Sequence, residues 1–308
     1  MKIFGTFSAS LTPFNDDYSI NNELFFNHCK QLLNEGADGI AIFGSTGEAN
    51  LISLNVKIEA MHALIERGID PSKLIPGTGL PSIQETIKLS TLAKDLSMGG
   101  VLVLPSYYYN NPTDEGVIDY YSKIVDSIAE ENFKIILYHI PQLSGVSINT
   151  NIISNLIKKY PNNIVGIKDS SNDLDNMINT IKSFPDFCVL SGSDSLALSV
   201  MREGGAGAIT ATANLSASLL SFIVNNANNL EKSNDLQKAH TLQDKIRRVV
   251  FSQEQISFMK AIMTIKSQNV VWKNIMPPLV SLKDIKNNKN IQETLKLLED
   301  MNKLSSNF

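Results

Sequence analysis

Residue types that often carry metal or redox chemistry are scarce in this chain of 308 residues. It has two cysteines, Cys29 and Cys188, far apart and without a CxxC or Cys/His spacing. We therefore interpret both as small buried apolar residues in a reducing compartment. Of the four histidines only His139 falls near the end of an expected strand. One histidine without clustered carboxylates makes a poor metal site, so we expect no metal.

Long apolar runs and concentrated positive charge are also missing. No apolar stretch approaches the roughly 20 residues that a membrane-spanning helix needs, and the first residues lack the pattern of a secretory signal peptide. The formal net charge is −4 and the basic residues are scattered, which argues against nucleic-acid binding. We expect a cytoplasmic protein, away from membranes, whose partners are small molecules and copies of itself.

What the chain does have is a repeated alternation of short apolar runs and longer amphipathic stretches. The apolar, β-branched runs predict eight strands, at 7–11, 39–43, 74–77, 100–104, 134–138, 164–168, 187–190 and 207–210. Helical patterns lie at 22–35, 54–67, 82–97, 114–131, 150–160, 173–183, 195–204 and 215–228. Such alternation calls for a parallel sheet, and eight units close into a (β/α)8 barrel. An open doubly wound sheet is the alternative, but no GxGxxG motif follows the first strand.

The strand signals stop after residue 228. Helical periodicity continues at 230–251, 257–268 and 290–304. We therefore expect an α/β protein with a catalytic (β/α)8 TIM barrel over residues 1–228 and a small C-terminal helical appendage over residues 229–308. Hydrophobic residues make up 43% of the chain, enough for a core of this size.

Reactive side chains gather where the expected strands end, and barrels of this kind carry their active sites at that edge. The strand over 164–168 ends in Lys168, where burial disfavours the ammonium and leaves a nucleophilic amine. A lysine that merely ends the strand in water is the alternative. Tyr138 ends the preceding strand, where its phenol can carry protons beside the amine. Packing alone also explains many tyrosines at such positions.

Two loops add further candidates. Residues 43–48 read FGSTGE, and two glycines with two hydroxyls are typical of a carboxylate or phosphate cradle, although such turns are common. Residues 107–109 are three consecutive tyrosines in a loop bounded by prolines. Because tyrosine is enriched at interfaces, we interpret them as a contact with a second subunit.

Five motifs appear in order along the chain: GSTGEA at 44–49, YYYNNP at 107–112, YHIP at 138–141, GIKDSS at 166–171 and GSDS at 192–195. Together they closely resemble the dihydrodipicolinate synthase and N-acetylneuraminate lyase family of class I aldolases, over essentially the whole barrel. The resemblance implies a homotetramer built as a dimer of dimers. It also implies that no cofactor is needed, because the reaction runs through a covalent imine between pyruvate and Lys168.

The resemblance assigns roles in the pyruvate half of the site. Lys168 forms the imine with the keto carbon, while Thr46 and the backbone at Ser45 hold the carboxylate. Tyr138 carries the proton, and Ser45 and Tyr109 complete its relay, with Tyr109 reaching in from the adjacent subunit. The remaining residues expected to bind substrate in this half are Gly47, Ser170, Gly192 and Ile209, the last through its backbone carbonyl.

The second substrate is where the sequence departs from its relatives. Synthases of this family bind a substrate carboxylate with an arginine after the YNVP motif, and Leu143 matches that position. The chain has four arginines, none at the end of an expected strand, and a leucine cannot replace charge-assisted hydrogen bonds. Sialic acid lyases share the leucine but use an Asp–Glu pair, here Asp194–Ser195, to hold sugar hydroxyls, and Ala211 replaces a serine that touches the sugar. A shorter hydroxylated 2-keto acid fits these differences.

Our leading hypothesis is a class I lyase that condenses pyruvate with an aldehyde or cleaves a 2-keto acid to pyruvate. The favoured substrate is a 2-keto-3-deoxy sugar acid or an N-acetylneuraminate-like compound. One alternative is 4-hydroxy-tetrahydrodipicolinate (dihydrodipicolinate) synthase with a relocated carboxylate site, and another is a dehydratase that uses the same imine. A non-catalytic ligand-binding barrel is the hypothesis from another class, since a fold does not guarantee function.

Overall fold

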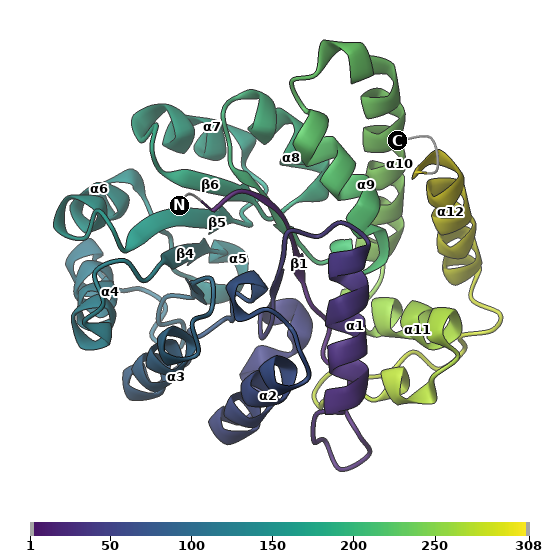
Figure 1. The fold of residues 1–308 in the computed structure, drawn as a ribbon, viewed down its shortest axis with the longest axis horizontal. Coiled ribbons are helices and arrows are strands. Elements are labelled where there is room, and N and C mark those ends of the chain that lie inside the picture. The colour runs from purple at the N-terminus through teal and green to yellow at the C-terminus, as the bar shows by residue number, and fades with distance from the viewer. Residues whose placement is uncertain (1–2, 306–308) are drawn as a thin grey trace.

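The structure is a computed structural model that describes residues 3–305. In this range one parallel sheet has the strand order β2-β1-β7-β6-β5-β4-β3. Helices surround the sheet, as expected for a barrel (Figure 1). The strands are β1 (Gly5–Ala9), β2 (Gly39–Ala41), β3 (Val101–Val103), β4 (Ile135–His139), β5 (Ile164–Asp169), β6 (Cys188–Ser191) and β7 (Gly207–Thr210).

The expected strand at 74–77 occupies the remaining gap between β2 and β3, held by isolated bridges to both neighbours. The Ile75 N–H donates to the Ile40 carbonyl at 2.9 Å, and the Leu102 N–H donates to the Pro76 carbonyl at 2.9 Å. The N–H groups of Ile75 and Gly77 donate to Ile40 and Ile42, whereas Pro76 has no N–H and leaves the segment one donor short on the side of β3. The prediction of a (β/α)8 TIM barrel is confirmed, with its eighth strand reduced to single bridges.

The helices of the ring follow the amphipathic stretches. Their bounds are α1 (Asn22–Asn34), α2 (Leu54–Glu66), α3 (Ile83–Asp95), α4 (Asp114–Ile128), α6 (Thr150–Lys159), α7 (Leu174–Ser183), α8 (Asp194–Arg202) and α9 (Ala213–Asn226). Most begin at a side chain that accepts a hydrogen bond from the first turn, as helix starts require, and these caps are Asn21, Ser53, Ser82, Thr113, Asn149 and Asp173. The sequence did not predict the short helix α5 (Pro141–Ser144), which Pro141 starts and a left-handed Gly145 ends.

The C-terminal region is helical, as expected, with α10 (Ser233–Phe251), α11 (Gln255–Ser267) and α12 (Lys289–Ser305). These helices lie along one side of the barrel, where α10 and α12 pack against α9 and α11 contacts α10 and α12 (Figure 1). Leu219 of α9, Ile246 of α10 and Ile262 of α11 belong to one hydrophobic cluster. The appendage therefore extends the packing of the barrel, and the division at residue 228 stays a prediction. No helix within residues 3–305 is both long and apolar enough to cross a lipid bilayer.

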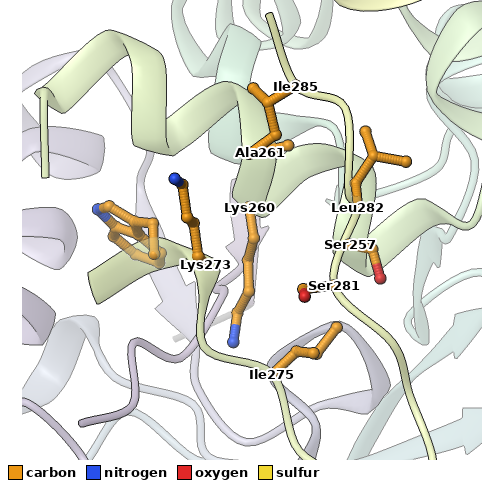
Figure 2. Close-up of a pocket in the computed structure, with 9 residues that line it drawn as sticks. Ser257, Lys260, Ala261, Lys273, Ile275, Ser281, Leu282 and Ile285 are labelled. Atoms are coloured by element: carbon orange, nitrogen blue, oxygen red, sulfur yellow. The ribbon is translucent and has the colours of Figure 1, made fainter. Parts of the chain in front are cut away.

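A buried ion pair ties this C-terminal region to the barrel. Lys260 of α11 points away from its own helix, beside a small pocket lined by Ser257 (Figure 2). Its ammonium pairs with the carboxylate of Glu48, and both side chains are almost completely buried. The ammonium also donates to the Asn274 carbonyl at 2.8 Å. Burial raises the pKa of Glu48 and lowers that of Lys260, and in each case the charge of the partner opposes the shift.

Candidate active site

A cavity of about 440 Å³ opens at the carboxyl ends of the strands, a size that suits a small-molecule ligand. It is lined from the barrel side by the ends of several strands and from the other side by α10 and the start of α11. The residues predicted from the sequence that line it are Ser45, Thr46, Tyr138, Leu143, Lys168, Ser170, Gly192 and Ile209. The structure thus brings most of the expected site residues together.

Lys168 and Tyr138 are neighbours across the parallel pair β4–β5. The strand register places Tyr138 directly opposite Lys168, so both side chains point to the same face of the sheet. The Lys168 Nζ lies 4.4 Å from the centroid of the Tyr138 ring. Both residues are 5% exposed. The arrangement places a primary amine and a phenol side by side at the bottom of the cavity.

The loop after β2 carries the predicted carboxylate cradle. Phe43 adopts a left-handed backbone conformation, with φ +57°, which a bulky residue accepts only where its surroundings enforce it. Ser45 and Thr46 follow in a 3₁₀ turn and line the cavity. Gly47 is not among the lining residues, and a Cβ there would stand 2.8 Å from the Ser10 carbonyl oxygen. Gly47 therefore packs the loop against the segment that follows β1, and its expected contact with the substrate stays a prediction.

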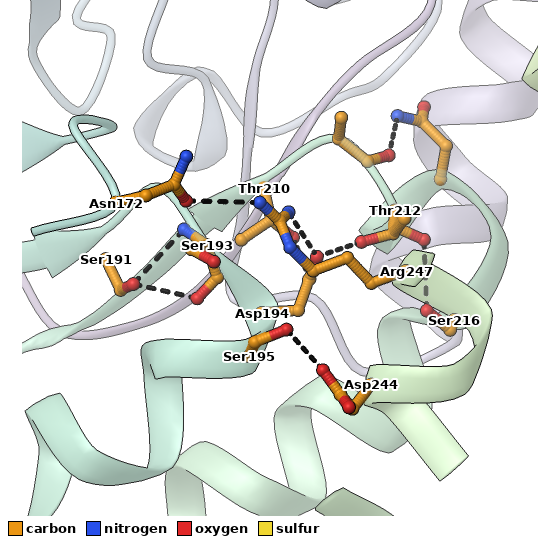
Figure 3. Close-up of polar contacts among 12 residues, drawn as sticks. Asn172, Ser191, Ser193, Asp194, Ser195, Thr210, Thr212, Ser216, Asp244 and Arg247 are labelled. Atoms are coloured by element: carbon orange, nitrogen blue, oxygen red, sulfur yellow. Dashed lines mark hydrogen bonds and ion pairs between the residues drawn. The ribbon is translucent and has the colours of Figure 1, made fainter. Parts of the chain in front are cut away.

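Asp194 and Ser195 are also outside the lining of the cavity. Asp194 is the first residue of α8 and is completely buried. Its carboxylate accepts hydrogen bonds from Thr210 Oγ1, at 2.6 Å, and from Thr212 Oγ1 (Figure 3). Ser195 Oγ donates to Asp244 of α10 at 2.6 Å. In this structure these polar groups bind other protein groups, and the expectation that they hold the hydroxyls of a substrate stays a prediction.

Arg247 of α10 lines the cavity, and the sequence analysis missed it because it considered only arginines at strand ends. Its Nη1 lies 3.3 Å from Asp194 Oδ2, and its Nη2 donates to Asn172 Oδ1 at 3.3 Å (Figure 3). The guanidinium carbon lies 3.8 Å from the centroid of the Phe251 ring. The side chain is only 10% exposed. The next residue, Arg248, is 78% exposed. Consecutive residues of a helix point in different directions, so the helical periodicity of this segment was the signal that could have placed Arg247 on its buried face.

The part of the cavity that is lined by α5, α10 and the start of α11, here called its outer half, is rich in polar groups that were not predicted from the sequence. Gln142 Nε2 donates to the Ser170 carbonyl at 2.6 Å, which holds α5 against the loop after β5. Glu254 caps α11, its Oε2 accepting from the Ser257 N–H at 2.8 Å. Leu143, at the rim, is 69% exposed. The missed lining residues with polar side chains are Gln142, Asn172, Arg247, Glu254 and Gln255.

Tyr109 stands apart from this cavity. It is 81% exposed, and its ring packs edge-on against Tyr108 at a centroid distance of 5.3 Å. It does not line the cavity of its own chain. Its expected role in the site of an adjacent subunit stays a prediction.

Comparison with known proteins identifies the family. The chain matches the Dihydrodipicolinate synthetase family over residues 2–298. It is 30% identical over 299 residues to a 4-hydroxy-tetrahydrodipicolinate synthase of Methanococcoides burtonii, covering 96% of this chain and 98% of that protein.

Solved structures agree. The 4-hydroxy-tetrahydrodipicolinate synthase of Methylacidiphilum fumariolicum SolV has a TM-score of 0.87 and 27% identity, covering 99% of both chains. The sialic acid aldolase of Ruminococcus gnavus has a TM-score of 0.88 at 21% identity, covering 98% of this chain and 99% of that one, a likeness of fold alone. This chain belongs to the dihydrodipicolinate synthetase family and is an enzyme of its class I, pyruvate-dependent lyase type.

Proposed function

We propose that this enzyme forms an imine between Lys168 and pyruvate, and that the imine makes or breaks a carbon–carbon bond to an aldehyde. The observation that carries the proposal is the buried Lys168 amine, 4.4 Å from the centroid of the Tyr138 ring, in a cavity also lined by Ser45 and Thr46. This geometry sets a primary amine near a phenol ring and two hydroxyl groups in one cavity, which are the groups that imine formation with a keto acid requires.

The chemistry balances with the groups at hand. The amine of Lys168 attacks C2 of pyruvate, and the carbonyl oxygen leaves as water after taking up two protons. One proton comes from the attacking nitrogen, and the Tyr138 phenol supplies the other. The Tyr138 phenolate left by that transfer takes a proton from C3 and gives an enamine. The enamine carbon attacks the aldehyde, whose oxygen takes the proton from Tyr138, and water then hydrolyses the imine, its proton going to Tyr138, to release a 2-keto acid. In the reverse direction the same steps cleave the 2-keto acid to pyruvate and an aldehyde.

We assign the following roles in this reaction to the residues around Lys168 and Tyr138. Thr46 and the backbone N–H of Ser45 hold the pyruvate carboxylate, and the Ser45 hydroxyl passes protons to and from Tyr138. Tyr109 of an adjacent subunit completes the relay, so the active unit is an oligomer, with a tetramer as the proposed form. We assign the Ile209 carbonyl the position near the amine that the family resemblance implies, and Ile209 and Gly192 both line the cavity. No metal or other cofactor takes part in these steps.

The second substrate occupies the outer half of the cavity. The sequence argument for a neutral, hydroxylated partner depended on Asp194 and Ser195, which lie outside the lining. The amide side chains of Gln142 and Asn172 still offer donors and acceptors for hydroxyl groups. A 2-keto-3-deoxy sugar acid therefore remains one candidate. The names of the relatives and the presence of Arg247 favour a second candidate, 4-hydroxy-tetrahydrodipicolinate synthase or a related reaction with an acidic aldehyde.

Borohydride reduction in the presence of pyruvate tests the imine. Reduction should add a lactyl group to Lys168 in the native enzyme, located by peptide mass spectrometry, and Lys168→Ala should abolish both label and turnover. Lys57 is the matched control, because it is fully buried outside the cavity and burial lowers its pKa to about 8. Labelling of Lys57 in place of Lys168 would show that low basicity alone decides reactivity, and the proposal would fail.

A further inference from the structure

The outer half of the cavity contains a positively charged side chain, Arg247, that the proposed pyruvate chemistry does not use. Arg247 enters from α10, opposite the strand ends that carry Lys168, and lines the same cavity. A guanidinium has five N–H donors, and its described hydrogen bonds, to Asp194 and Asn172, use one each on Nη1 and Nη2. Donors therefore remain for a ligand.

The surroundings of Arg247 hold it in one orientation. Asp194 is itself fixed by Thr210 and Thr212, and the ring of Phe251 lies against the guanidinium plane at 3.8 Å from its carbon. Figure 3 shows the arginine reaching across from its helix to this cluster. A guanidinium whose orientation is fixed in advance binds a carboxylate with less loss of conformational entropy.

We propose that Arg247 binds a carboxylate on the second substrate, so that the enzyme takes aldehydes that carry an acid group and the 2-keto acids built from them. This inference rests on the proposed function. It places the carboxylate site on α10, whereas the leucine at position 143 leaves the loop after β4 without a charge. Glu254 is the acidic residue among those that line the cavity, and one of its carboxylate oxygens accepts from the Ser257 N–H.

The test compares aldehydes that differ in their distal group, each with pyruvate as the partner. The probes are 4-oxobutanoate, which carries a carboxylate, butanal, which ends in a methyl group, and glyceraldehyde, which carries hydroxyls. For Arg247→Met we expect kcat/KM to fall about a hundredfold or more for 4-oxobutanoate, the size expected when a charged hydrogen-bonded pair loses one partner. For butanal and glyceraldehyde the change should stay within about threefold.

Arg248→Met is the matched control, since the neighbouring arginine is exposed and pairs with Asp244. It should leave kcat/KM unchanged for all three aldehydes. Arg247→Met also leaves the buried Asp194 carboxylate without its positively charged partner. The double variant Arg247→Met/Asp194→Asn removes this unpaired charge. It should show the same loss of kcat/KM for 4-oxobutanoate alone. Pyruvate-dependent labelling of Lys168 should persist in every variant.

The outcomes separate the two proposals. An equal loss for all three aldehydes, or no loss for 4-oxobutanoate, would show that Arg247 only supports the fold and would overturn the inference. Absence of a label on Lys168 in the native enzyme would instead overturn the proposed function.

Discussion

The buried pair of Lys260 and Glu48 allows a quantitative test of how the C-terminal helices support the mouth of the barrel. We expect Lys260→Met to lower the free energy of unfolding by about 4–6 kcal/mol. Removing one partner of a buried ion pair costs about 3–5 kcal/mol, because the other charge is left uncompensated. The Asn274 carbonyl also loses its donor at 2.8 Å, which adds about 1 kcal/mol. Methionine keeps most of the apolar stem, so packing changes little.

The double variant Lys260→Met/Glu48→Gln separates charge from packing. It should recover to within about 2 kcal/mol of the native enzyme, since a neutral pair avoids the buried charge. The glutamine oxygen can still accept the hydrogen bond that Glu48 takes from the Met276 N–H at 2.8 Å.

The pH dependence of the single variant gives a second signature. Burial raises the pKa of Glu48, and in Lys260→Met the lysine that opposes this shift is gone. The folded variant therefore keeps Glu48 protonated to a higher pH than the unfolded chain, in which a glutamate carboxyl has a pKa of about 4.3. The deficit in stability should therefore be small near pH 4.5 and grow as the pH rises through the pKa of the folded state.

Urea unfolding followed by circular dichroism, at one protein concentration and at several pH values, measures the native enzyme and both variants. The reasoning fails if the single variant stays within about 1 kcal/mol of the native enzyme at neutral pH, or if the double variant is as unstable as the single one.

Two further predictions concern the oligomer and acid stability. Tyr109→Phe should lower kcat while leaving the trapping of pyruvate on Lys168 intact, because the Tyr109 hydroxyl acts only in the proton relay. Sedimentation should show that the native enzyme is at least dimeric, and a fully active monomer would contradict this. Burial lowers the pKa of His28 to about 4, against 6.5 for a solvated histidine, so the unfolded state binds more protons below pH 6.5. The free energy of unfolding should then fall by about 3 kcal/mol between pH 6.5 and 4, and His28→Gln should flatten this part of the urea-unfolding profile; an unchanged slope in the variant would rule out His28 as the cause.

The sequence alone was sufficient for the parts of this protein that depend on local periodicity. Strand and helix patterns repeat with different periods, and their alternation leads to one parallel barrel. Since parallel strands end at one edge, Lys168 and Tyr138 were expected at the same mouth, and the strand register places them opposite each other. The segment at 74–77 was placed correctly, but only the structure shows that it is held to its two neighbours by isolated bridges.

Only the tertiary structure decided what faces the substrate from outside the barrel. Arg247 belongs to a helix whose periodicity is clear, yet its position over the cavity depends on how the apolar faces of α9, α10 and α11 pack together. That packing is a sum of many weak, non-directional contacts among residues far apart in the chain, which no local pattern encodes. The same holds for Asp194, which the motif places at a strand end but which α8 directs into a buried cluster, where it positions the arginine.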